Sequence, residues 1–476
     1  MVTTKSVKGW SKSVLSPAQE FALTPLPVLS GRLPEGLRGS LYRNGPGRLK
    51  RRKKSVGHWF DGDGAVLAVH FQDEEAKGVY RYVQTEGFQK EEKAGTFFFP
   101  NYGMTAPGGV WNNWIRPVKN AANTSVLALP DQLLALWEGG HPHALNLETL
   151  ETKGIEHLSL KSEERFSAHP KVDPKTGEFF NFGITLGLNA VLKVYKYDAN
   201  GKLLKKGSQR LKGLPLIHDF VLAGPYLVFF VSPVRVNLFS AGLGVKSYSE
   251  AIAWKPEEGT QVFVFDRETL RLISRGETDS WFQWHFANGC VDSDGLVSVE
   301  MVAYDDFRTN QYLQEVATGS TKTIAKGMLS QVKLDPQTGK VIRRENVCDS
   351  SCEFPIVAPN QVGESWRYTY MGVHRDDREI GQELLGAIAS FDRETGNVAI
   401  ADCGKNRYPS EPIYVPNQQN LNQGWLITVV YDGNNHTSEV WLYDSQQLEN
   451  EPICRLGLPR VVPPSFHGTW KPSLNS

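Results

Sequence analysis

The sequence is poor in several features that mark whole classes of protein. It has five cysteines among 476 residues, too few for a disulfide framework, which indicates a reducing compartment. It has no run of 18 apolar residues that would form a transmembrane helix, and its first 15 residues lack the apolar segment of a secretory signal. Its 52 basic and 52 acidic side chains cancel, which argues against nucleic-acid binding through phosphate neutralisation. We therefore expect a cytoplasmic globular protein that binds no nucleic acid.

Short catalytic and metal-binding motifs are also missing. None of the 11 histidines has HExxH spacing, and no CxxC pair is present. The sequence lacks the fingerprints of P-loops, Rossmann folds and serine hydrolases. Asp61-Gly62-Asp63-Gly64 has the start of a calcium loop without its later ligands. Any metal site must therefore be assembled from residues that are distant in the chain.

Short strands dominate what is present. Glycine (44), proline (27) and aromatic residues (11%) are frequent, and apolar runs of four to seven residues are bounded by turn residues. Such runs, rich in β-branched and aromatic residues, are typical of β-strands. They include 226–231, 262–265, 296–302, 426–431 and 440–443. The pattern predicts an all-β protein.

A hairpin signature recurs along the chain. An apolar strand ends in Asp, a few turn residues follow, and a second strand begins, as in FVFDRETLRLI and VKLDPQTGKVI. The last four anchors are Asp266, Asp335, Asp392 and Asp444, at intervals of roughly 50 to 70 residues. Such intervals are typical of a β-propeller, here with about seven blades carrying insertions. Unrelated hairpins in a sandwich are the alternative.

Two segments depart from the strand pattern within one expected domain of residues 1–476. Residues 1–27 have the character of an N-terminal arm with a short helix. Residues 232–259 are apolar and loop-like, and form an insertion in the β-rich chain.

Four histidines stand beside strands or turns. They are His169 in SAHPKVDP, His218 in LIHDF, His285 in WFQWHFANG and His467 in SFHGTW. Their spacing makes no local motif. In a propeller, however, the inner strands converge on one axis, so one histidine from each of four blades could surround a metal. As the alternative, any of them could be a core histidine.

Ten segments together resemble the carotenoid cleavage oxygenase family along essentially the whole chain. They occur in the family's order: YRNGPG (42–47), HWFDGDG (58–64), ANTSV, LALWEGGHPHAL, SAHPKVDP, HDF, HFANG, CEFP, EPIYVP (411–416) and FHGTW. The resemblance implies a seven-bladed β-propeller with an iron on its axis beneath a dome of loops and short helices.

The resemblance also implies the site. The Fe(2+) ligands would be His169, His218, His285 and His467. Three glutamates, Glu138, Glu353 and Glu411, would hydrogen-bond to ligand histidines and leave the His169 imidazole without a carboxylate; such bonds orient a ligand histidine. Thr124 matches a residue near the open side of the iron. The implied reaction is cleavage of a polyene C=C bond by O2 into two carbonyl products, with no catalytic residue beyond the metal site.

Three substrate classes compete within the resembled family: carotenoids or apocarotenoids, stilbenes and retinyl esters. Stilbene-cleaving members carry a lysine near the strand before the first glutamate, and Gln132 in that region argues against stilbenes. We expect a microbial-type enzyme that cleaves a carotenoid or apocarotenoid. Trp137 and Trp284, each adjacent to a metal-site residue, are expected to line the substrate tunnel, unless they pack inside the blades.

The resemblance implies peripheral contact with a membrane, from which a carotenoid must be extracted. In the insertion, Val236, Leu238, Phe239 and Leu243 are expected to enter one leaflet, with Arg235 and Lys246 near the headgroups. A helix that caps the propeller is the alternative.

A propeller hydrolase and a non-catalytic propeller scaffold are the rival functions, and neither accounts for the four histidines.

Overall fold

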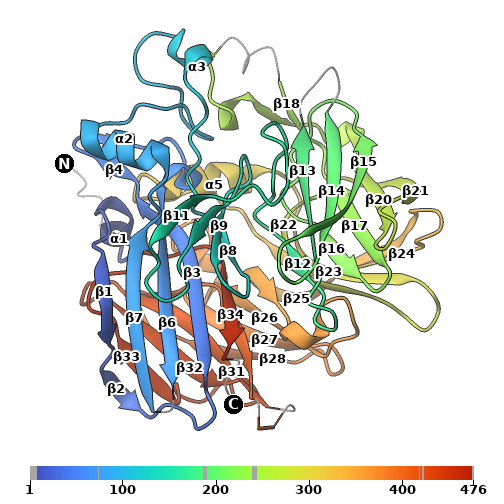
Figure 1. The fold of residues 1–476 in the computed structure, drawn as a ribbon. Coiled ribbons are helices and arrows are strands. Elements are labelled where there is room, and N and C mark those ends of the chain that lie inside the picture. Colours follow the sequence, from blue (N-terminus) through green and yellow to red (C-terminus); the bar gives the residue numbers. More distant parts are fainter. Residues whose placement is uncertain are drawn as a thin grey trace.

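The computed structural model describes residues 8–72, 74–185, 190–237, 244–417, 419–420 and 423–473. The main strands form seven blades, which belong to five sheets because one 11-stranded sheet spans three blades (Figure 1). Two further two-stranded pairs, β4 (Lys50–Arg51) with β5 (Lys54–Ser55) and β18 (Val234–Val236) with β19 (Ile252–Trp254), are separate from these sheets. This arrangement confirms the predicted all-β propeller.

The first three blades use the N-terminal part of the chain and its last strand. Blade 1 contains β34 (Gly468–Pro472), β3 (Gly39–Arg48), β6 (Asp63–Gln72), β7 (Glu75–Tyr82) and β1 (Phe21–Pro25). Blade 2 contains β8 (Ser125–Ala128), β9 (Leu133–Leu136), β10 (His143–Leu145) and β11 (Thr152–Ile155). Blade 3 contains β12 (Lys171–Val172), β13 (Phe179–Thr185), β14 (Val191–Tyr197) and β15 (Leu203–Arg210).

The next three blades form one continuous sheet. Blade 4 contains β16 (Val221–Ala223), β17 (Tyr226–Val231), β20 (Thr260–Asp266) and β21 (Leu272–Thr278). Blade 5 contains β22 (Phe282–Val291), β23 (Val297–Tyr304), β24 (Met328–Leu334) and the first part of β25 (Val341–Ile356). The second part of β25 begins blade 6, with β26 (Tyr368–Val373), β27 (Ala387–Asp392) and β28 (Val398–Asp402).

The seventh blade closes the ring. It contains β29 (Arg407–Pro409), β30 (Ile413–Pro416), β31 (Gly424–Asp432), β32 (Thr437–Asp444), β33 (Cys454–Gly457) and β2 (Val28–Gly31). The C-terminal β34 pairs with β3 in blade 1, and the N-terminal β2 pairs with β33 in blade 7 (Figure 1). Both ends of the chain therefore connect the first and last blades: the N-terminal end through β1 and β2, and the C-terminal end through β33 and β34. These connections remove an open sheet edge at the junction.

The Asp-anchored hairpins lie at equivalent places in successive blades. They join the third strand to the fourth in blades 3 to 7, with anchors Asp198, Asp266, Asp335, Asp392 and Asp444. The β24–β25 turn shows the chemistry: the Asp335 carboxylate accepts the Gln337 N–H at 2.9 Å, and Gly339 has a φ of 71°. A glycine is favoured there because a side chain strains that conformation. The predicted repeat is confirmed.

The described part of the N-terminal segment, residues 8–27, contains a strand in addition to the expected helix, and residues 1–7 lie outside the described residues. A short helix is present as expected, α1 (Ser11–Leu15). Residues 21–25, however, form β1, which pairs with β7 at the outer edge of blade 1. The unpaired N–H and C=O groups of β7 provide the partner, which composition alone does not reveal.

Loops and short helices cover one end of the ring. They include α2 (Glu86–Ala94), α3 (Asn112–Ile115), α5 (Arg308–Val316) and the 3-10 turns η1 (Trp59–Asp61) and η2 (Ser249–Ala251). The same end carries the β4 (Lys50–Arg51)–β5 (Lys54–Ser55) hairpin and the β18 (Val234–Val236)–β19 (Ile252–Trp254) pair. The other 3-10 turns are η3 (Pro256–Glu258), η4 (Pro359–Gln361) and η5 (Asp377–Glu379).

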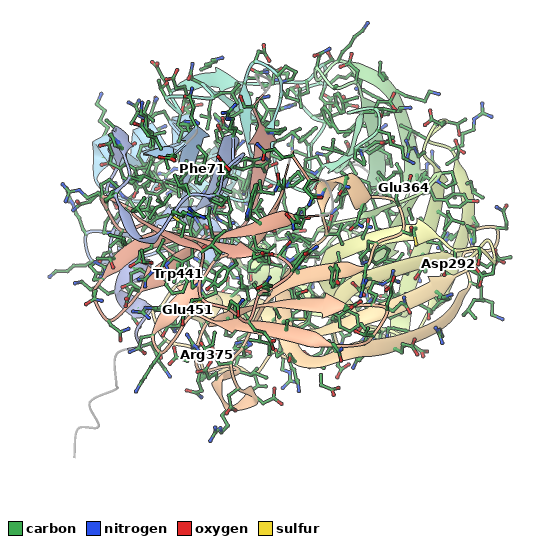
Figure 2. All side chains as sticks on the ribbon, turned by 90° about the horizontal axis from the view of Figure 1, so that it is seen from below. Phe71, Asp292, Glu364, Arg375, Trp441 and Glu451 are labelled. Carbon is green, nitrogen blue, oxygen red and sulfur yellow. The ribbon has the colours of Figure 1, made fainter. Side chains whose placement is uncertain are left out.

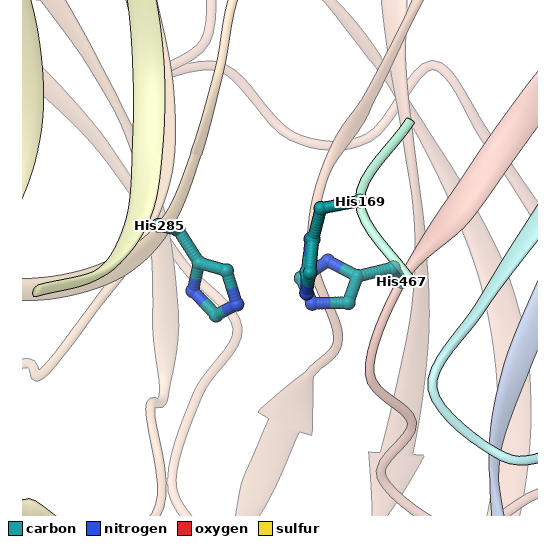
Figure 3. A group of neighbouring side chains, drawn as sticks. All are labelled: His169, His285 and His467. Atoms are coloured by element: carbon teal, nitrogen blue, oxygen red, sulfur yellow. The ribbon is translucent and has the colours of Figure 1, made fainter. Parts of the chain in front are cut away.

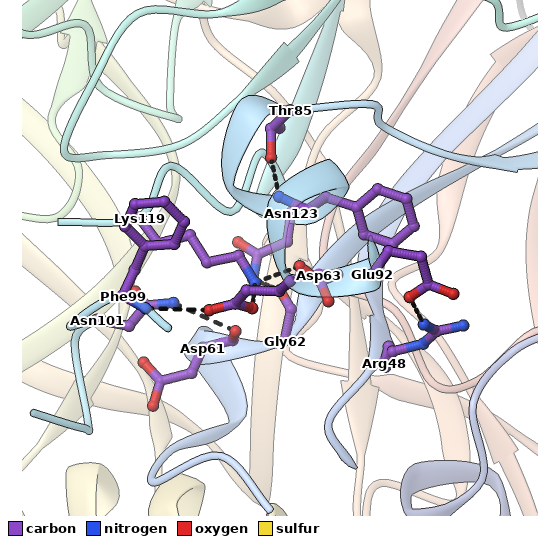
Figure 4. Close-up of polar contacts among 12 residues, drawn as sticks. Arg48, Asp61, Gly62, Asp63, Thr85, Glu92, Phe99, Asn101, Lys119 and Asn123 are labelled. Atoms are coloured by element: carbon purple, nitrogen blue, oxygen red, sulfur yellow. Dashed lines mark hydrogen bonds and ion pairs between the residues drawn. The ribbon is translucent and has the colours of Figure 1, made fainter. Parts of the chain in front are cut away.

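A buried ionic network anchors part of this cover (Figure 4). Lys119 contacts Asp63 and donates to Glu91 at 2.7 Å, and Arg51 donates to Asp63 at 2.7 Å. Asp61 accepts the backbone N–H groups of His58 and Gly103. Buried charges need such partners, so the DGDG motif is explained by structural bonds.

Apolar side chains fill the space between neighbouring blades. Phe71 and Trp441, both labelled in Figure 2, are buried, whereas Glu451 is exposed. The buried strand β17 (YLVFFV) of blade 4 has apolar residues on both faces. A blade that is covered on both faces by its neighbours can hold such a continuous apolar run, whereas β23 (VSVEMVAY) of blade 5 also buries Ser298 and Glu300.

Candidate metal centre

Each of the seven blades contributes one of the seven predicted metal-site residues. Blades 1, 3, 4 and 5 contribute the four histidines, and blades 2, 6 and 7 contribute the three glutamates. His467 precedes β34, His169 precedes β12, His218 precedes β16, and His285 lies in β22. Glu138 follows β9, Glu353 lies in β25, and Glu411 lies between β29 and β30. The inner ends of the blades therefore bring together residues from across 330 positions of sequence.

The four imidazoles converge on the propeller axis. The ring centroids of His169 lie 4.3 Å from His218, 5.3 Å from His285 and 4.8 Å from His467. The Nε2 atoms of His218 and His285 are 3.2 Å apart. Figure 3 shows the rings of His169, His285 and His467 turned toward a common centre. Ligand atoms of these three residues lie within 4.8 Å of one another.

This donor set fits a metal ion. Two imidazole nitrogens bound to one ion at about 2.0–2.1 Å and at right angles lie about 3 Å apart, close to the observed separation. The buried Nε2 of His169 has no hydrogen-bond partner among the described residues, and such an orphaned atom needs an explanation. Burial, assisted by the neighbouring histidines, holds the pKa of His169 and of His285 well below the usual value. Both imidazoles are therefore neutral, the form that binds metals.

Carboxylates hold three of the four rings from behind. Glu353 Oε2 lies 2.5 Å from His285 Nδ1, and Glu411 Oε1 lies 2.8 Å from His467 Nδ1. The Glu138 carboxylate contacts His218 Nδ1, but it lies 3.8 Å from His169 Nε2. Each Nδ1 contact leaves the opposite nitrogen, Nε2, facing the centre. Within the described part of the chain, no carboxylate is recorded at hydrogen-bond distance from His169.

The carboxylates are themselves fixed by other groups. Glu353 accepts the Tyr304 hydroxyl at 3.1 Å and the Phe354 N–H at 2.6 Å. Burial raises the pKa of Glu353 to about 7. Burial acts to raise the pKa of Glu411 as well, but His467 and the nearby Arg43 outweigh it and lower that pKa.

Arg43 is a site residue that the sequence reasoning did not single out. Its guanidinium is buried and donates to the Glu411 carbonyl at 2.6 Å, to Ser465 Oγ at 3.0 Å and to the Phe466 carbonyl at 2.9 Å. These bonds connect β3 of blade 1 to the segments that carry Glu411 and His467. The YRNGPG motif contains this arginine, but its role depends on the ring closure, which the motif does not reveal.

A narrow apolar cavity of about 110 Å³ adjoins the histidines. Its walls include Phe60, Leu313, Phe354, Leu384 and Phe466, together with His218, His285 and His467. Thr124 and Trp284 both line it, which brings these two predicted residues beside the centre. Trp284 packs edge-on against His218 with 4.8 Å between ring centroids, and its Nε1 donates to Thr309 at 3.0 Å.

Two other residues from the sequence analysis lie outside the walls of this cavity. Trp137 is not among the cavity-lining residues, and its ring lies against Gly139 and Gly140. Gln132 lies in the β8–β9 turn and its amide donates to Glu156. The expectation that Trp137 lines the substrate tunnel and the argument from Gln132 against stilbenes both stay predictions.

The predicted membrane patch also needs correction. Val236 is buried at 7% exposure in the core of blades 3 and 4, and the buried Arg235 donates to Glu258 at 2.8 Å. β18 pairs with β19 and is covered, so its apolar pattern reflects packing. Leu238, Phe239 and Leu243 lie outside the described residues.

An exposed apolar patch lies beside this insertion, around α3. We call it the α3 patch; it consists of Val110, Trp111, Trp114, Ile115, Val118 and Val245. Trp111 and Trp114 are each 62% exposed, and Ile115 is 72% exposed. The Asn113 side chain donates to the Gly244 carbonyl at 3.0 Å, which connects the loop carrying Val245 to α3. None of the helices in the described ranges is both long and apolar enough to cross a membrane.

Comparisons with known proteins agree with this geometry. The family model for retinal pigment epithelial membrane protein matches residues 15–472. The apocarotenoid-15,15'-oxygenase of Synechocystis is 30% identical over 98% of this chain and 96% of its own. Carotenoid 9,10(9',10')-cleavage dioxygenase 1 of Arabidopsis thaliana is 27% identical over 94% of this chain and 86% of its own.

Solved structures show the same fold. Cobalt-substituted Synechocystis apocarotenoid oxygenase superposes with a TM-score of 0.89 at 29% identity and covers 98% of both chains. A mutant of that enzyme also has a TM-score of 0.89 over 98% of both chains. With a family match over nearly the whole chain, the same propeller and a converging histidine centre, this chain belongs to the retinal pigment epithelial membrane protein family of carotenoid oxygenases.

Proposed function

We propose that this protein is a non-haem Fe(II) dioxygenase that cleaves one C=C bond of an apocarotenoid or carotenoid. The bond is cut by insertion of both atoms of O2, which yields two carbonyl products. Electrons balance without an external reductant, in agreement with the lack of a nucleotide-binding motif in the sequence. The observation that carries the proposal is the convergence of four histidines beside an apolar cavity.

His169, His218, His285 and His467 would hold the iron. When bound, Fe(II) supplies the site at which O2 is activated. Glu138, Glu353 and Glu411 hold their imidazoles in the orientation that presents Nε2 to the centre. Phe60, Trp284 and Phe466 line the cavity with apolar surface, which positions an alkene and excludes water.

The relatives act on different substrates, so membership of the family does not by itself identify the substrate class. Resveratrol cleavage oxygenase 1 of Aspergillus fumigatus and isoeugenol monooxygenase of Pseudomonas nitroreducens are each 25% identical to this chain. The apocarotenoid enzyme of Synechocystis has higher identity. The predominantly apolar cavity walls also suit a hydrocarbon polyene, since an unpaired phenol hydroxyl is costly to bury.

A polyene substrate partitions into lipid, so the proposal includes reversible contact with one membrane leaflet. The α3 patch is the candidate surface because it carries two half-exposed tryptophans and an isoleucine on one loop-helix segment. Exposed apolar clusters on a soluble surface mark interaction sites, and tryptophan favours the lipid–water interface. Lys246, exposed beside Val245, provides a cation near the headgroups.

One experiment tests the reaction and the substrate class together. The protein is purified without oxygen, loaded with Fe(II), and incubated under ¹⁸O2 with a β-apocarotenal, β-carotene, resveratrol or isoeugenol in separate reactions. We expect one iron per chain and two ¹⁸O-labelled carbonyl products from the β-apocarotenal. Cleavage of resveratrol or isoeugenol alone would overturn the substrate class and retain the metal chemistry. A protein that binds no iron would overturn the function.

A further inference from the structure

Asp219 connects three of the four histidine-bearing segments, and it belongs to neither the ligand set nor the three glutamates. It directly follows His218 in blade 4 and is 2% exposed. Its Oδ1 accepts the Phe220 N–H at 2.8 Å, and its Oδ2 accepts the Phe286 N–H at 3.1 Å. Because Phe286 directly follows His285, one carboxylate holds the backbone beside two ligands in adjacent blades.

The third connection is an ion pair with Lys171. The Lys171 ammonium lies 2.8 Å from Asp219 Oδ1 and 3.0 Å from Oδ2. Lys171 is in β12 of blade 3, two residues after His169. Asp219 therefore contacts residues from blades 3, 4 and 5, each within two positions of a histidine.

This connection bears on His169 in particular. The other three imidazoles each have a carboxylate at Nδ1, whereas the Glu138 carboxylate lies 3.8 Å from His169 Nε2, the nitrogen that faces the centre. The backbone N–H of His169 donates to Ser167 Oγ at 3.1 Å. The Lys171–Asp219 pair fixes the backbone two residues from His169 against blades 4 and 5, and so bears on the distance between His169 and the other rings.

We infer that Asp219, paired with Lys171, is the positioning residue that sets the spacing of His169, His218 and His285. This inference rests on the proposed metal function. It assigns Asp219 a role through the ligands, without contact with substrate. Charge-assisted bonds of a buried carboxylate suit this role, since they are short and directional.

The test compares Asp219→Asn with the same substitution at another buried aspartate that forms an ion pair. Asn keeps the volume and an oxygen for one backbone N–H, but it removes the charge that holds Lys171. Asp173→Asn is the control: Asp173 is also a buried aspartate, and it pairs with Arg267, between blades 3 and 4. Lys171→Met is the second variant, which leaves the backbone bonds of Asp219 intact.

Each protein is loaded with Co(II), and its visible absorption spectrum, its Co(II) affinity by chelator competition and its melting temperature are measured. Co(II) is a suitable probe because the Synechocystis relative has been solved with cobalt. We expect both Asp219→Asn and Lys171→Met to weaken Co(II) binding roughly 10–100-fold, the usual range for groups behind the ligands. Both should also shift the Co(II) bands, and Asp173→Asn should lower only the melting temperature.

The outcomes separate this inference from the function it rests on. Wild-type Co(II) affinity and spectrum in Lys171→Met, or in a folded Asp219→Asn, would overturn the positioning role. If Asp219→Asn does not fold, Lys171→Met decides alone. A wild-type protein that binds neither Co(II) nor Fe(II) would overturn the proposed metal function instead.

Discussion

Glu411 and His467 meet across the junction at which the propeller closes. Glu411 Oε1 lies 2.8 Å from His467 Nδ1, and its Oε2 accepts the Gly468 N–H at 2.8 Å. Glu411 belongs to blade 7, and Gly468 begins β34 in blade 1. The same carboxylate thus orients a candidate metal ligand and fastens the final strand, so the site and the ring closure depend on one another.

Glu353→Gln should weaken metal binding. The carboxylate that now lies 2.5 Å from His285 Nδ1 becomes a neutral amide, a poorer acceptor that no longer raises the basicity of the imidazole. We expect iron affinity to fall roughly 10–100-fold, measured by chelator competition. The matched control is Glu439→Gln, a buried glutamate that pairs with Arg455 in blade 7. Equal metal affinities in the two variants would contradict the role of Glu353.

Metal removal should destabilise the protein. An ion that binds only the folded state adds RT ln(1 + [M]/Kd), about 2.7 kcal/mol at a hundredfold excess over Kd. We expect the melting temperature to fall on treatment with a chelator and to recover when Fe(II) or Co(II) is added back. His285→Ala provides the control, since its melting temperature should not respond to either metal. A chelator-insensitive wild type would contradict the proposed centre.

Trp284→Ala should impair substrate positioning beyond its effect on stability. The indole lines the cavity and contacts His218, so its removal lets the polyene take other positions. We expect kcat/KM for a β-apocarotenal to fall about 10–100-fold, since small misplacements of a reacting group are costly. Trp281→Ala is the control, because Trp281 is 1% exposed in a different apolar cluster. Both variants should lose about 3–5 kcal/mol of stability, but only the first should lose activity per folded molecule.

Replacing the two exposed tryptophans should weaken lipid binding. In Trp111→Ser/Trp114→Ser, we expect binding to phosphatidylcholine–phosphatidylglycerol liposomes to fall roughly tenfold or more, since burying one large apolar side chain contributes about 1.5–3 kcal/mol. Cleavage of a detergent-dispersed substrate should persist. The control is Ile342→Ser, which removes an isoleucine that is 52% exposed on β25. Unchanged flotation of the double variant with liposomes would refute the α3 patch as the contact surface.

The sequence by itself determined the strand repeat. Each Asp-anchored turn from Asp198 to Asp444 depends on bonds within a few residues, so local chemistry is sufficient to predict it. The order of the motifs indicated the histidines and glutamates through family resemblance. That each blade contributes one of these seven residues becomes evident only once the strands are assigned to sheets.

Tertiary structure decided what local pattern could not. Val236 and Trp111 are both apolar, yet the first is buried under β19 and blade 3 and the second is exposed, because burial depends on which surface arrives from elsewhere in the chain. Trp137 and Trp284 are each adjacent to a site residue, but only Trp284 is among the residues that line the cavity of about 110 Å³. Asp219 joins three blades through residues up to 67 positions apart. Those contacts exist because the closed ring brings the inner strands to one axis, a geometric constraint that no single segment of the sequence carries.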